Sequence, residues 1–295
     1  MTSPGRVQWF RVAPFIALHA SGLFVFLVGF SWTAFVVAVI VYFARVFALT
    51  AFYHRYFSHR AFKTTRVLQF IGALLGNAAG QRGPIWWAAH HRHHHRAADR
   101  PDDIHSPVQQ GFLWSHMLWF MTDEAYQTNY SVVKDWIKFP ELRFLERFDF
   151  LAPTLLAVSM YGLGSVMEVS APQLHTDRWQ MLVWGFVVST LALYHVTFGI
   201  NSLAHKYGTR RYNTDDDSRN NWWLALATFG EGWHNNHHHF PSSARQGFMW
   251  WEIDVSYYLL VIMSWLGLVW DLRPVPAAVR SRNLVLTASG DGGAA

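Results

Sequence analysis

Histidine is concentrated in three short stretches of this chain. They read "HRYFSH" (54–59), "HHRHHHR" (90–96) and "HNNHHH" (234–239). The second and third stretches each contain an HxxHH spacing, and residues at i, i+3 and i+4 share one face of a helix. Each HxxHH can therefore direct three imidazoles at one point, which is the arrangement that a bound metal ion needs.

A fourth element, "NSLAH" (201–205), places Asn201 and His205 about one helical turn apart. The four elements together supply nine candidate histidine ligands: His54, His59, His91, His94, His95, His205, His234, His237 and His238. A single zinc site takes about four ligands, so nine histidines predict two metal ions with four to five ligands each. His90, His93 and His239 fall outside the spacing and are interpreted as surface or supporting residues.

The type of metal follows from the ligands. Neutral imidazole suits zinc, copper, iron and nickel, and paired HxxHH motifs at a membrane surface favour two irons that react with dioxygen. The chain has no cysteine, which excludes disulfides, thiolate metal sites and an iron–sulfur cluster of its own. A histidine-rich tract that merely scavenges metal is the plainer alternative. Three clusters and a helix-end histidine argue against it.

The composition predicts that these motifs are carried by membrane helices. Apolar residues make up 52% of the chain and charged residues only 15%, against about a quarter charged in soluble domains. Four runs approach the roughly 20 apolar residues that a crossing needs, at 12–30, 32–52, 151–169 and 181–200. They form two helical hairpins. A signal peptide is the alternative for the first run, but that run leads directly into another span.

Of two shorter apolar runs, 67–80 is interpreted as interfacial or re-entrant and 255–270 as interfacial. A crossing at 67–80 would separate the first two histidine stretches by a bilayer, whereas four crossings place every cluster on one side. Lys and Arg gather in 53–150 and 201–250, which predicts that the clusters and both termini are cytoplasmic. Residues 1–280 are expected to form one domain and 281–295 a disordered tail.

These motifs resemble those of the integral-membrane fatty acid desaturases, in their acyl-CoA (stearoyl-CoA-type) Δ9 branch. The family's HxxxxH, HxxHH and HxxHH boxes stand here at 54–59, 91–95 and 234–238, its NSxAH helix end stands at 201–205, and "GEG" and "FP" flank the third box. The resemblance covers roughly residues 20–270. It implies an all-α membrane protein, with four transmembrane helices and a cytoplasmic helical cap that holds a di-iron site.

The resemblance also implies an activity and its partners. The nine histidines would bind two irons, and Asn201 would reach one iron through a water. The enzyme would use O₂ to introduce a cis double bond, at Δ9, into a saturated fatty acyl-CoA in the bilayer. Electrons would come from a ferredoxin or a cytochrome b5-like donor with its reductase. The net charge of +5 is attributed to cytoplasmic basic surfaces and not to binding of nucleic acid.

The sequence departs from animal acyl-CoA desaturases at positions where those proteins contact CoA. Basic residues would follow "GFxxSH" and precede the second box, but Asp123, Glu124, Ala88 and Ala89 stand here. A CoA contact would either be absent or be remade by other basic residues, such as Arg82, Arg92, Arg100, Lys206, Arg210 and Arg211. Acyl-CoA is still the first choice of substrate, with acyl-lipid and acyl-carrier-protein substrates as alternatives. A di-iron hydroxylase or alkane monooxygenase would share the irons. A metal transporter would need more polar residues along its spans.

Several residues outside the boxes are candidates for supporting roles. Glu231 directly precedes the third box, and His105, with Asp102 and Asp103, follows the second, so these side chains could orient ligand imidazoles. His195 lies within a span, where polar side chains usually face the bundle, and is interpreted as packing or tunnel lining.

An acyl tunnel is expected to run into the bundle beneath the histidines. Tyr42 lies twelve residues before the first box, which is about 18 Å deeper along a helix. We expect Tyr42 to form the floor of this tunnel, with Ala38 leaving space one turn deeper. An ordinary packing role for Tyr42 is the alternative.

Overall fold

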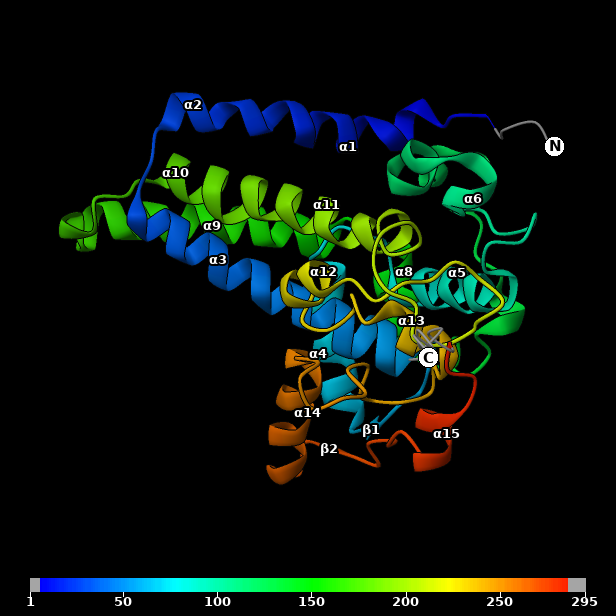
Figure 1. The fold of residues 1–295 in the computed structure, drawn as a ribbon. Coiled ribbons are helices and arrows are strands. Elements are labelled where there is room, and N and C mark those ends of the chain that lie inside the picture. Colours follow the sequence, from blue (N-terminus) through cyan, green and yellow to red (C-terminus); the bar gives the residue numbers. More distant parts are fainter. Residues whose placement is uncertain (1–5, 286–295) are drawn as a thin grey trace, which may run out of the picture.

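The computed structural model describes residues 6–285 and consists mainly of helices (Figure 1). Four helical segments are long and apolar enough to cross a membrane: Trp9–Val28, Trp32–Ser58, Leu151–Ser170 and Arg178–Ser202. Their bounds lie close to those of the four predicted spans. The prediction of an all-α membrane fold with two hairpins is therefore confirmed.

The first hairpin is closed by a short, well-defined turn. Its first arm comprises α1 (Trp9–Ser21), η1 (Gly22–Phe24) and α2 (Val25–Val28), and its second arm is α3 (Trp32–Phe47), which continues into the π-helix η2 (Ala48–Ser58). Gly29 adopts φ +70°, a left-handed conformation that glycine tolerates. The hydroxyl of Ser31 then accepts the Ala34 N–H and caps α3.

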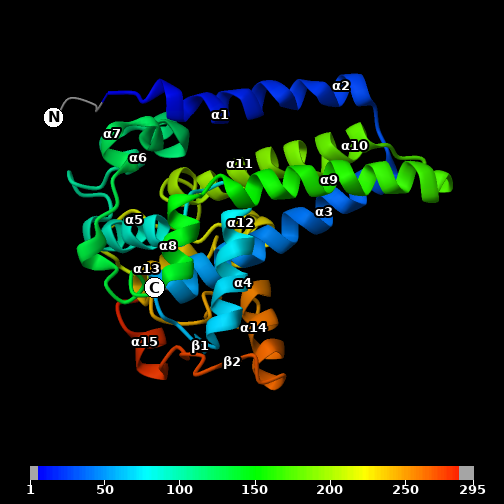
Figure 2. The same cartoon turned by 180° about the vertical axis from the view of Figure 1, so that it is seen from behind.

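The second hairpin packs against α3. It comprises α9 (Leu151–Ser170), η6 (Pro172–Leu174), α10 (Arg178–Leu182), the π-helix η7 (Val183–Val188) and α11 (Ser189–Ser202). Figures 1 and 2 show α3, α9 and α11 lying together, while α1 and α2 run along one side of them. Only 6% of the first span is buried, against 44% of the second. The first span is thus the most loosely attached of the four.

The remaining elements form a cap at one end of the spans (Figure 1). Between the hairpins lie β1 (Lys63–Thr64), α4 (Arg66–Asn77), α5 (Pro84–Ala97), α6 (Pro107–Gln110), η3 (Trp114–Leu118), η4 (Trp119–Met121), α7 (Asp123–Tyr126), η5 (Tyr130–Val132) and α8 (Pro140–Arg147). After α11 come α12 (Trp222–Ala227), α13 (His234–His239), α14 (Val255–Trp265), β2 (Val269–Trp270) and α15 (Ala277–Ser281). β1 and β2 pair antiparallel. With 12 and 11 residues, α4 and α14 are too short to cross a bilayer.

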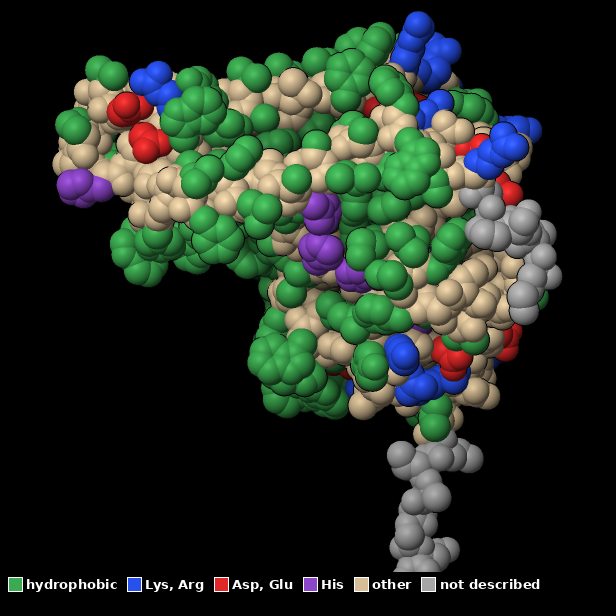
Figure 3. Space-filling model, turned by 90° about the horizontal axis from the view of Figure 1, so that it is seen from above, with side chains coloured by type: hydrophobic (Ala, Val, Ile, Leu, Met, Phe, Trp, Pro, Cys, Tyr) green, Lys and Arg blue, Asp and Glu red, His purple; other side chains and the backbone are tan. Residues whose placement is uncertain are grey.

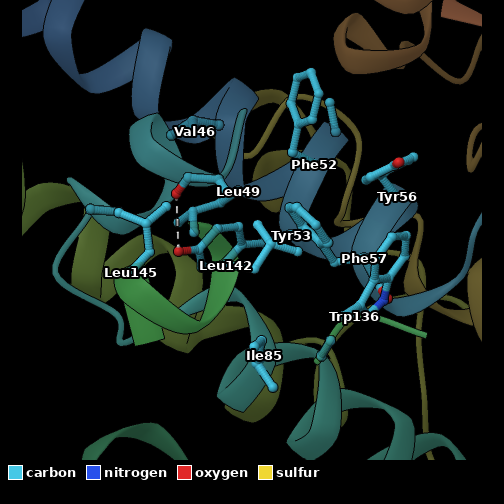
Figure 4. Packing of buried hydrophobic residues seen from close by; sticks show 14 of the residues in the cluster. Val46, Leu49, Phe52, Tyr53, Tyr56, Phe57, Ile85, Trp136, Leu142 and Leu145 are labelled. Atoms are coloured by element: carbon cyan, nitrogen blue, oxygen red, sulfur yellow. Dashed lines mark hydrogen bonds between the residues drawn. The ribbon is translucent and has the colours of Figure 1, made fainter. Parts of the chain in front are cut away.

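A buried cluster of mostly aromatic and aliphatic side chains joins η2 to the cap (Figure 4). Phe57 of η2, Ile85 of α5 and Leu142 of α8 are fully buried in it, and the indole N–H of Trp136 donates to the Phe57 carbonyl at 2.7 Å. Burial of such side chains contributes about 1.5–3 kcal/mol each. The packing fixes the first histidine stretch, on η2, against the second, on α5.

Part of the expected C-terminal tail is held against the cap. The Val285 N–H donates to the Arg211 carbonyl at 2.8 Å, and the Asn213 N–H donates to the Asn283 carbonyl at 2.8 Å. Residues 281–285 therefore pack on the segment that follows α11. The rest of the expected tail, 286–295, lies outside the described residues.

Candidate metal centre

The nine candidate histidines meet in two clusters where the second and fourth spans enter the cap. One cluster consists of His54, His59, His91, His95 and His237, and the other of His94, His205, His234 and His238. Within each cluster the ligand nitrogens lie within 4.8 Å of one another. The division into five and four is the one expected for two metal ions.

The five-histidine cluster depends on the π-helix η2. In an α-helix, residues five apart point about 140° away from each other, which would separate His54 from His59. A π-helix bonds residue i to i+5, and the His59 N–H does donate to the His54 carbonyl, at 3.2 Å. Both imidazoles consequently face the same side, with His59 Nε2 2.8 Å from His91 Nε2. His237 Nε2, from α13, lies 2.9 Å from His54 Nε2.

The four-histidine cluster joins α5, the turn that follows α11, and α13. His205 Nε2 lies 3.0 Å from His234 Nε2. His238 Nε2 is buried and has no hydrogen-bond partner within residues 6–285. A buried polar atom without a partner is costly, and an imidazole nitrogen aimed at three others is one that a metal ion would satisfy. The donor set therefore fits a metal in this cluster.

In four of the nine histidines, the ring nitrogen that does not face the cluster, Nδ1, contacts a carboxylate. The Nδ1–H groups of His94, His205 and His238 donate to Asp103 (3.0 Å), Asp99 (2.8 Å) and Asp216 (2.7 Å) respectively. His54 Nδ1 contacts Glu231 in the same way. This arrangement fixes the tautomer and presents Nε2 to the centre of the cluster, as in many metal sites.

The charge state of the imidazoles suits metal binding. Burial and repulsion between neighbouring imidazoles hold the pKa of five histidines well below its usual value: His59, His91, His95, His234 and His237. Such groups are neutral at physiological pH, and only neutral imidazole binds a metal.

The supporting carboxylates stay ionised although they are buried. Burial alone would raise the pKa of Asp99, but the hydrogen bond from His205 lowers it to about 2. Against the effect of burial, electrostatic attraction by His105 and His94 and the hydrogen bond from His94 hold the pKa of Asp103 below its usual range. Attraction by His238 and its hydrogen bond do the same for the pKa of Asp216. An imidazole becomes more positively polarised when it binds a metal. Each carboxylate can stabilise this charge on the imidazole that it faces.

Two arginines, Arg55, which is buried, and Arg92, which is partly exposed, brace the elements that carry the histidines. Arg55 of η2 is 1% exposed and pairs with Glu231 at 3.0 Å and Asp254 at 2.9 Å. Arg92 of α5 pairs with Asp135 at 2.8 Å and donates from Nη2 to the Phe57 carbonyl at 2.7 Å. Arg55 thus ties η2 to the loop before α13, and Arg92 ties α5 to the end of η2.

The residues that were expected to orient the ligand imidazoles differ in how they contact them. Glu231 contacts a ligand imidazole directly, as described above. His105 packs its ring 4.4 Å from that of His94, and its Nδ1 lies 3.7 Å from Asp103, too far for a hydrogen bond. Asp103 itself holds His94. Asp99 and Asp216 were not among the expected residues, because only the folded chain brings these loop acids to the histidines.

The histidines outside the spacing point away from both clusters. His90 Nδ1 lies 3.0 Å from the Trp86 carbonyl, and His93 Nε2 lies 3.0 Å from the Asp102 carbonyl. His239 Nε2 lies 2.9 Å from the carbonyl of Val279. Each of the three contacts backbone, so the structure separates them from the nine.

A cavity of about 1000 Å³ leads to both clusters. Its inner end is lined by His54, His91, His94, His234 and Asn201, together with apolar side chains such as Leu49, Trp87, Phe120 and Phe198. Such a volume is at the upper end of the range for small-molecule sites. It is large and apolar enough for a long alkyl chain.

The three expected tunnel residues do not line this cavity within residues 6–285. The Tyr42 hydroxyl donates to the Ala227 carbonyl at 2.9 Å, and Ala38 is buried within α3. His195 Nε2 lies 3.3 Å from His19 Nε2 on α1. A tunnel role for Tyr42, Ala38 and His195 stays a prediction that the shape of the cavity does not support.

The amino-acid sequence is similar to those of known proteins. Residues 8–270 match the family model described as "Fatty acid desaturase". The sn-1 stearoyl-lipid 9-desaturase of Anabaena variabilis is 34% identical over 271 residues, which cover 91% of this chain and 94% of that protein. The acyl-CoA C20 Delta5-desaturase of Anemone leveillei is 36% identical (94% and 86% covered), and the Delta-9 acyl-lipid desaturase 1 of Arabidopsis thaliana is 37% identical (88% and 81% covered).

Proposed function

Because the chain belongs to the fatty acid desaturase family, we propose that it introduces a cis double bond at Δ9 of a saturated fatty acyl chain. It would use O₂ and electrons from an external donor. The observation that carries the proposal is the pair of histidine clusters at the inner end of an apolar cavity. A metal pair and an alkyl chain can meet there.

Two irons are the metals we propose for the clusters. The five- and four-histidine sets would hold one iron each, with Asn201 near the centre through a water. Bound there, the irons would supply the O₂ activation needed to remove two hydrogens from carbons that no side-chain base could deprotonate. The protein's own part is to keep the imidazoles neutral and oriented, to hold the alkyl chain in the apolar cavity and to exclude water from it.

The electrons are proposed to come from a ferredoxin or a cytochrome b5-like protein with its reductase. The chain has no cysteine and so cannot carry an iron–sulfur cluster of its own. The concentration of Lys and Arg in the cap segments favours a cytoplasmic position for the clusters and both termini. The donor would then approach from the cytoplasm.

The acyl carrier has two candidates. The sequence resemblance favours acyl-CoA. An acyl lipid is the second candidate, because relatives named for the two carriers are about equally similar to this chain, at 36% and 34% identity. The residues that line the cavity away from the histidines help to distinguish between these two carriers.

The proposal is tested by product analysis in an expressing host. The host is fed perdeuterated stearate, and its acyl chains are analysed by mass spectrometry after cleavage at the double bond. Chains that have lost two deuterons, with the bond at the ninth carbon, are expected for the wild type and not for His94→Ala or His237→Ala. Hydroxylated chains, or no change, would contradict the proposal.

A further inference from the structure

The cavity that reaches the histidines also extends along two of the candidate membrane spans. Beyond its inner end it is walled by one face of α1, one face of α9 and residues of η7 and α11 such as Phe186 and Thr197. The α1 residues are Phe10, Arg11, Pro14, Phe15, Ala17, Leu18 and Ser21, and the α9 wall comprises Pro153, Thr154 and Ala157 with the preceding Phe150. These spacings of three and four residues define single helical faces. Because only 6% of the first span is buried, we expect this part of the cavity to open to the surrounding lipid.

The depth of this opening matches one leaflet of a bilayer. Ser21 lies ten residues beyond Arg11, another lining residue, so the opening follows α1 for about 15 Å. The hydrocarbon core of a bilayer is about 30 Å thick. An acyl chain of the leaflet on the cap side could therefore lie between α1 and α9, with its end at the level of Ser21.

Three arginines line the cavity where these spans begin: Arg11, Arg82 and Arg147. Arg11 and Arg82 place their guanidinium groups 4.8 and 4.9 Å from the ring centroid of Tyr126. Arg82 also pairs with Asp149 at 2.6 Å. Figure 3 shows basic side chains at this end of the molecule, whereas the surface along the spans is largely apolar.

The arginines leave a net positive mouth. Arg11 and Arg147 are exposed and have no ion pair within residues 6–285. Three acids line the cavity, and one of them, Glu231, lies at the inner end beside His54. The acids near the arginines are Asp149, already paired with Arg82, and Glu146. Glu146 accepts the Trp86 N–H and the Thr128 hydroxyl, and burial raises its pKa. The available charge therefore suits one anionic group held by two or three guanidiniums.

We propose that this mouth binds the phosphodiester of a membrane glycerophospholipid, whose acyl chain reaches the histidine clusters from the bilayer. Arg11 and Arg147 contact the phosphate, with Arg82 beside it. One acyl chain passes to the clusters, and the other lies between α1 and α9. The inference rests on the proposed desaturase function and names its acyl carrier.

The same geometry disfavours CoA. The nucleotide of CoA carries several phosphates, which would extend from the mouth into the cytoplasm. Asp123 and Glu124 begin α7, the short helix that ends at Tyr126 beside Arg11 and Arg82, and they would repel the additional phosphates. A single chain on CoA would also leave the lipid-facing space between α1 and α9 unused.

The test uses iron-loaded, full-length enzyme with a reducing system and three substrates. The first is distearoyl phosphatidylglycerol in vesicles, the second is a distearoyl galactolipid in vesicles of the same kind, and the third is stearoyl-CoA. We expect the phospholipid to be preferred. The double variant Arg11→Gln, Arg147→Gln should raise KM for the phospholipid roughly tenfold with little change in kcat, and added salt should weaken the wild-type preference.

Arg143→Gln is the matched control. Arg143 is exposed on α8, one turn before Arg147, but it does not line the cavity. Arg143→Gln removes one exposed positive charge next to Arg147, as each substitution of the double variant does at its own position, and it should leave KM unchanged. A KM increase as large in this control would overturn the proposed phosphate contact.

Two further outcomes would overturn the inference and leave the proposed function standing. One is desaturation of stearoyl-CoA with no change in the vesicle phospholipid. The other is equal use of phospholipid and galactolipid that does not respond to the arginine substitutions. Native mass spectrometry supplies a readout without turnover. If phosphatidylglycerol is retained by the wild type and lost from the double variant, yet no carrier is desaturated, the headgroup site stands and the proposed function fails.

Discussion

Replacing Asp216 should weaken metal binding at the four-histidine cluster without unfolding the protein. Its carboxylate accepts the His238 Nδ1–H at 2.7 Å, and the side chain of Asp216 is 10% exposed and that of His238 is 1% exposed. Loss of such a partner typically lowers metal affinity about 10- to 100-fold. Asp216→Asn keeps an oxygen that can accept this bond but removes the charge, so we expect the lower end of that range. Asp216→Ala also frees the ring to rotate and should approach the upper end.

The assay is a titration of the metal-free protein with Fe²⁺ in competition with a chelator of known affinity. Asp215→Asn is the matched control, because this neighbour lies in the same loop with a side chain 96% exposed, 3.9 Å from Arg100. It should bind iron as the wild type does. Wild-type affinity in Asp216→Ala would refute the orienting role. An equal loss in Asp215→Asn would show that loop charge alone is responsible.

Three other substitutions test the surroundings of the site. Gly232→Ala would push a methyl group into the backbone of Ala225 and displace α13. Iron content should therefore fall, and a lower melting temperature should show a loss of about 1–3 kcal/mol in the free energy of unfolding. A variant that still binds its full complement of iron would contradict this. Tyr42→Ala should leave the lengths of the product chains unchanged, since Tyr42 bonds to Ala227 outside the cavity; longer products would restore its role as the tunnel floor. His239→Ala should keep both metals, and loss of iron from it would place His239 among the ligands.

The spans and the clusters could be predicted because their signals are local. Run length identifies a transmembrane helix, and an i, i+3, i+4 spacing identifies a common face, as in His91, His94 and His95. The parity of the crossings then places all the motifs on one side. None of these steps requires knowledge of which residues distant in sequence come into contact.

The features that sequence reasoning missed depend on such contacts. Asp99 follows the second box and Asp216 precedes the third, but only folding shows that they hold His205 and His238. The π-helix could have been found, since His54 and His59 are five residues apart and only a π-helix brings such a pair to one face. The position of the cavity could not, because it depends on how loosely α1 packs.

Reconstitution with iron tests the central claim most directly. The metal-free protein is titrated with Fe²⁺, and bound iron and single-turnover desaturation are measured at each addition. Two clusters of five and four histidines predict saturation at two irons per chain, with turnover appearing only as the second iron binds. Full activity at one iron per chain, or equal activity with Zn²⁺, would contradict a two-iron desaturase.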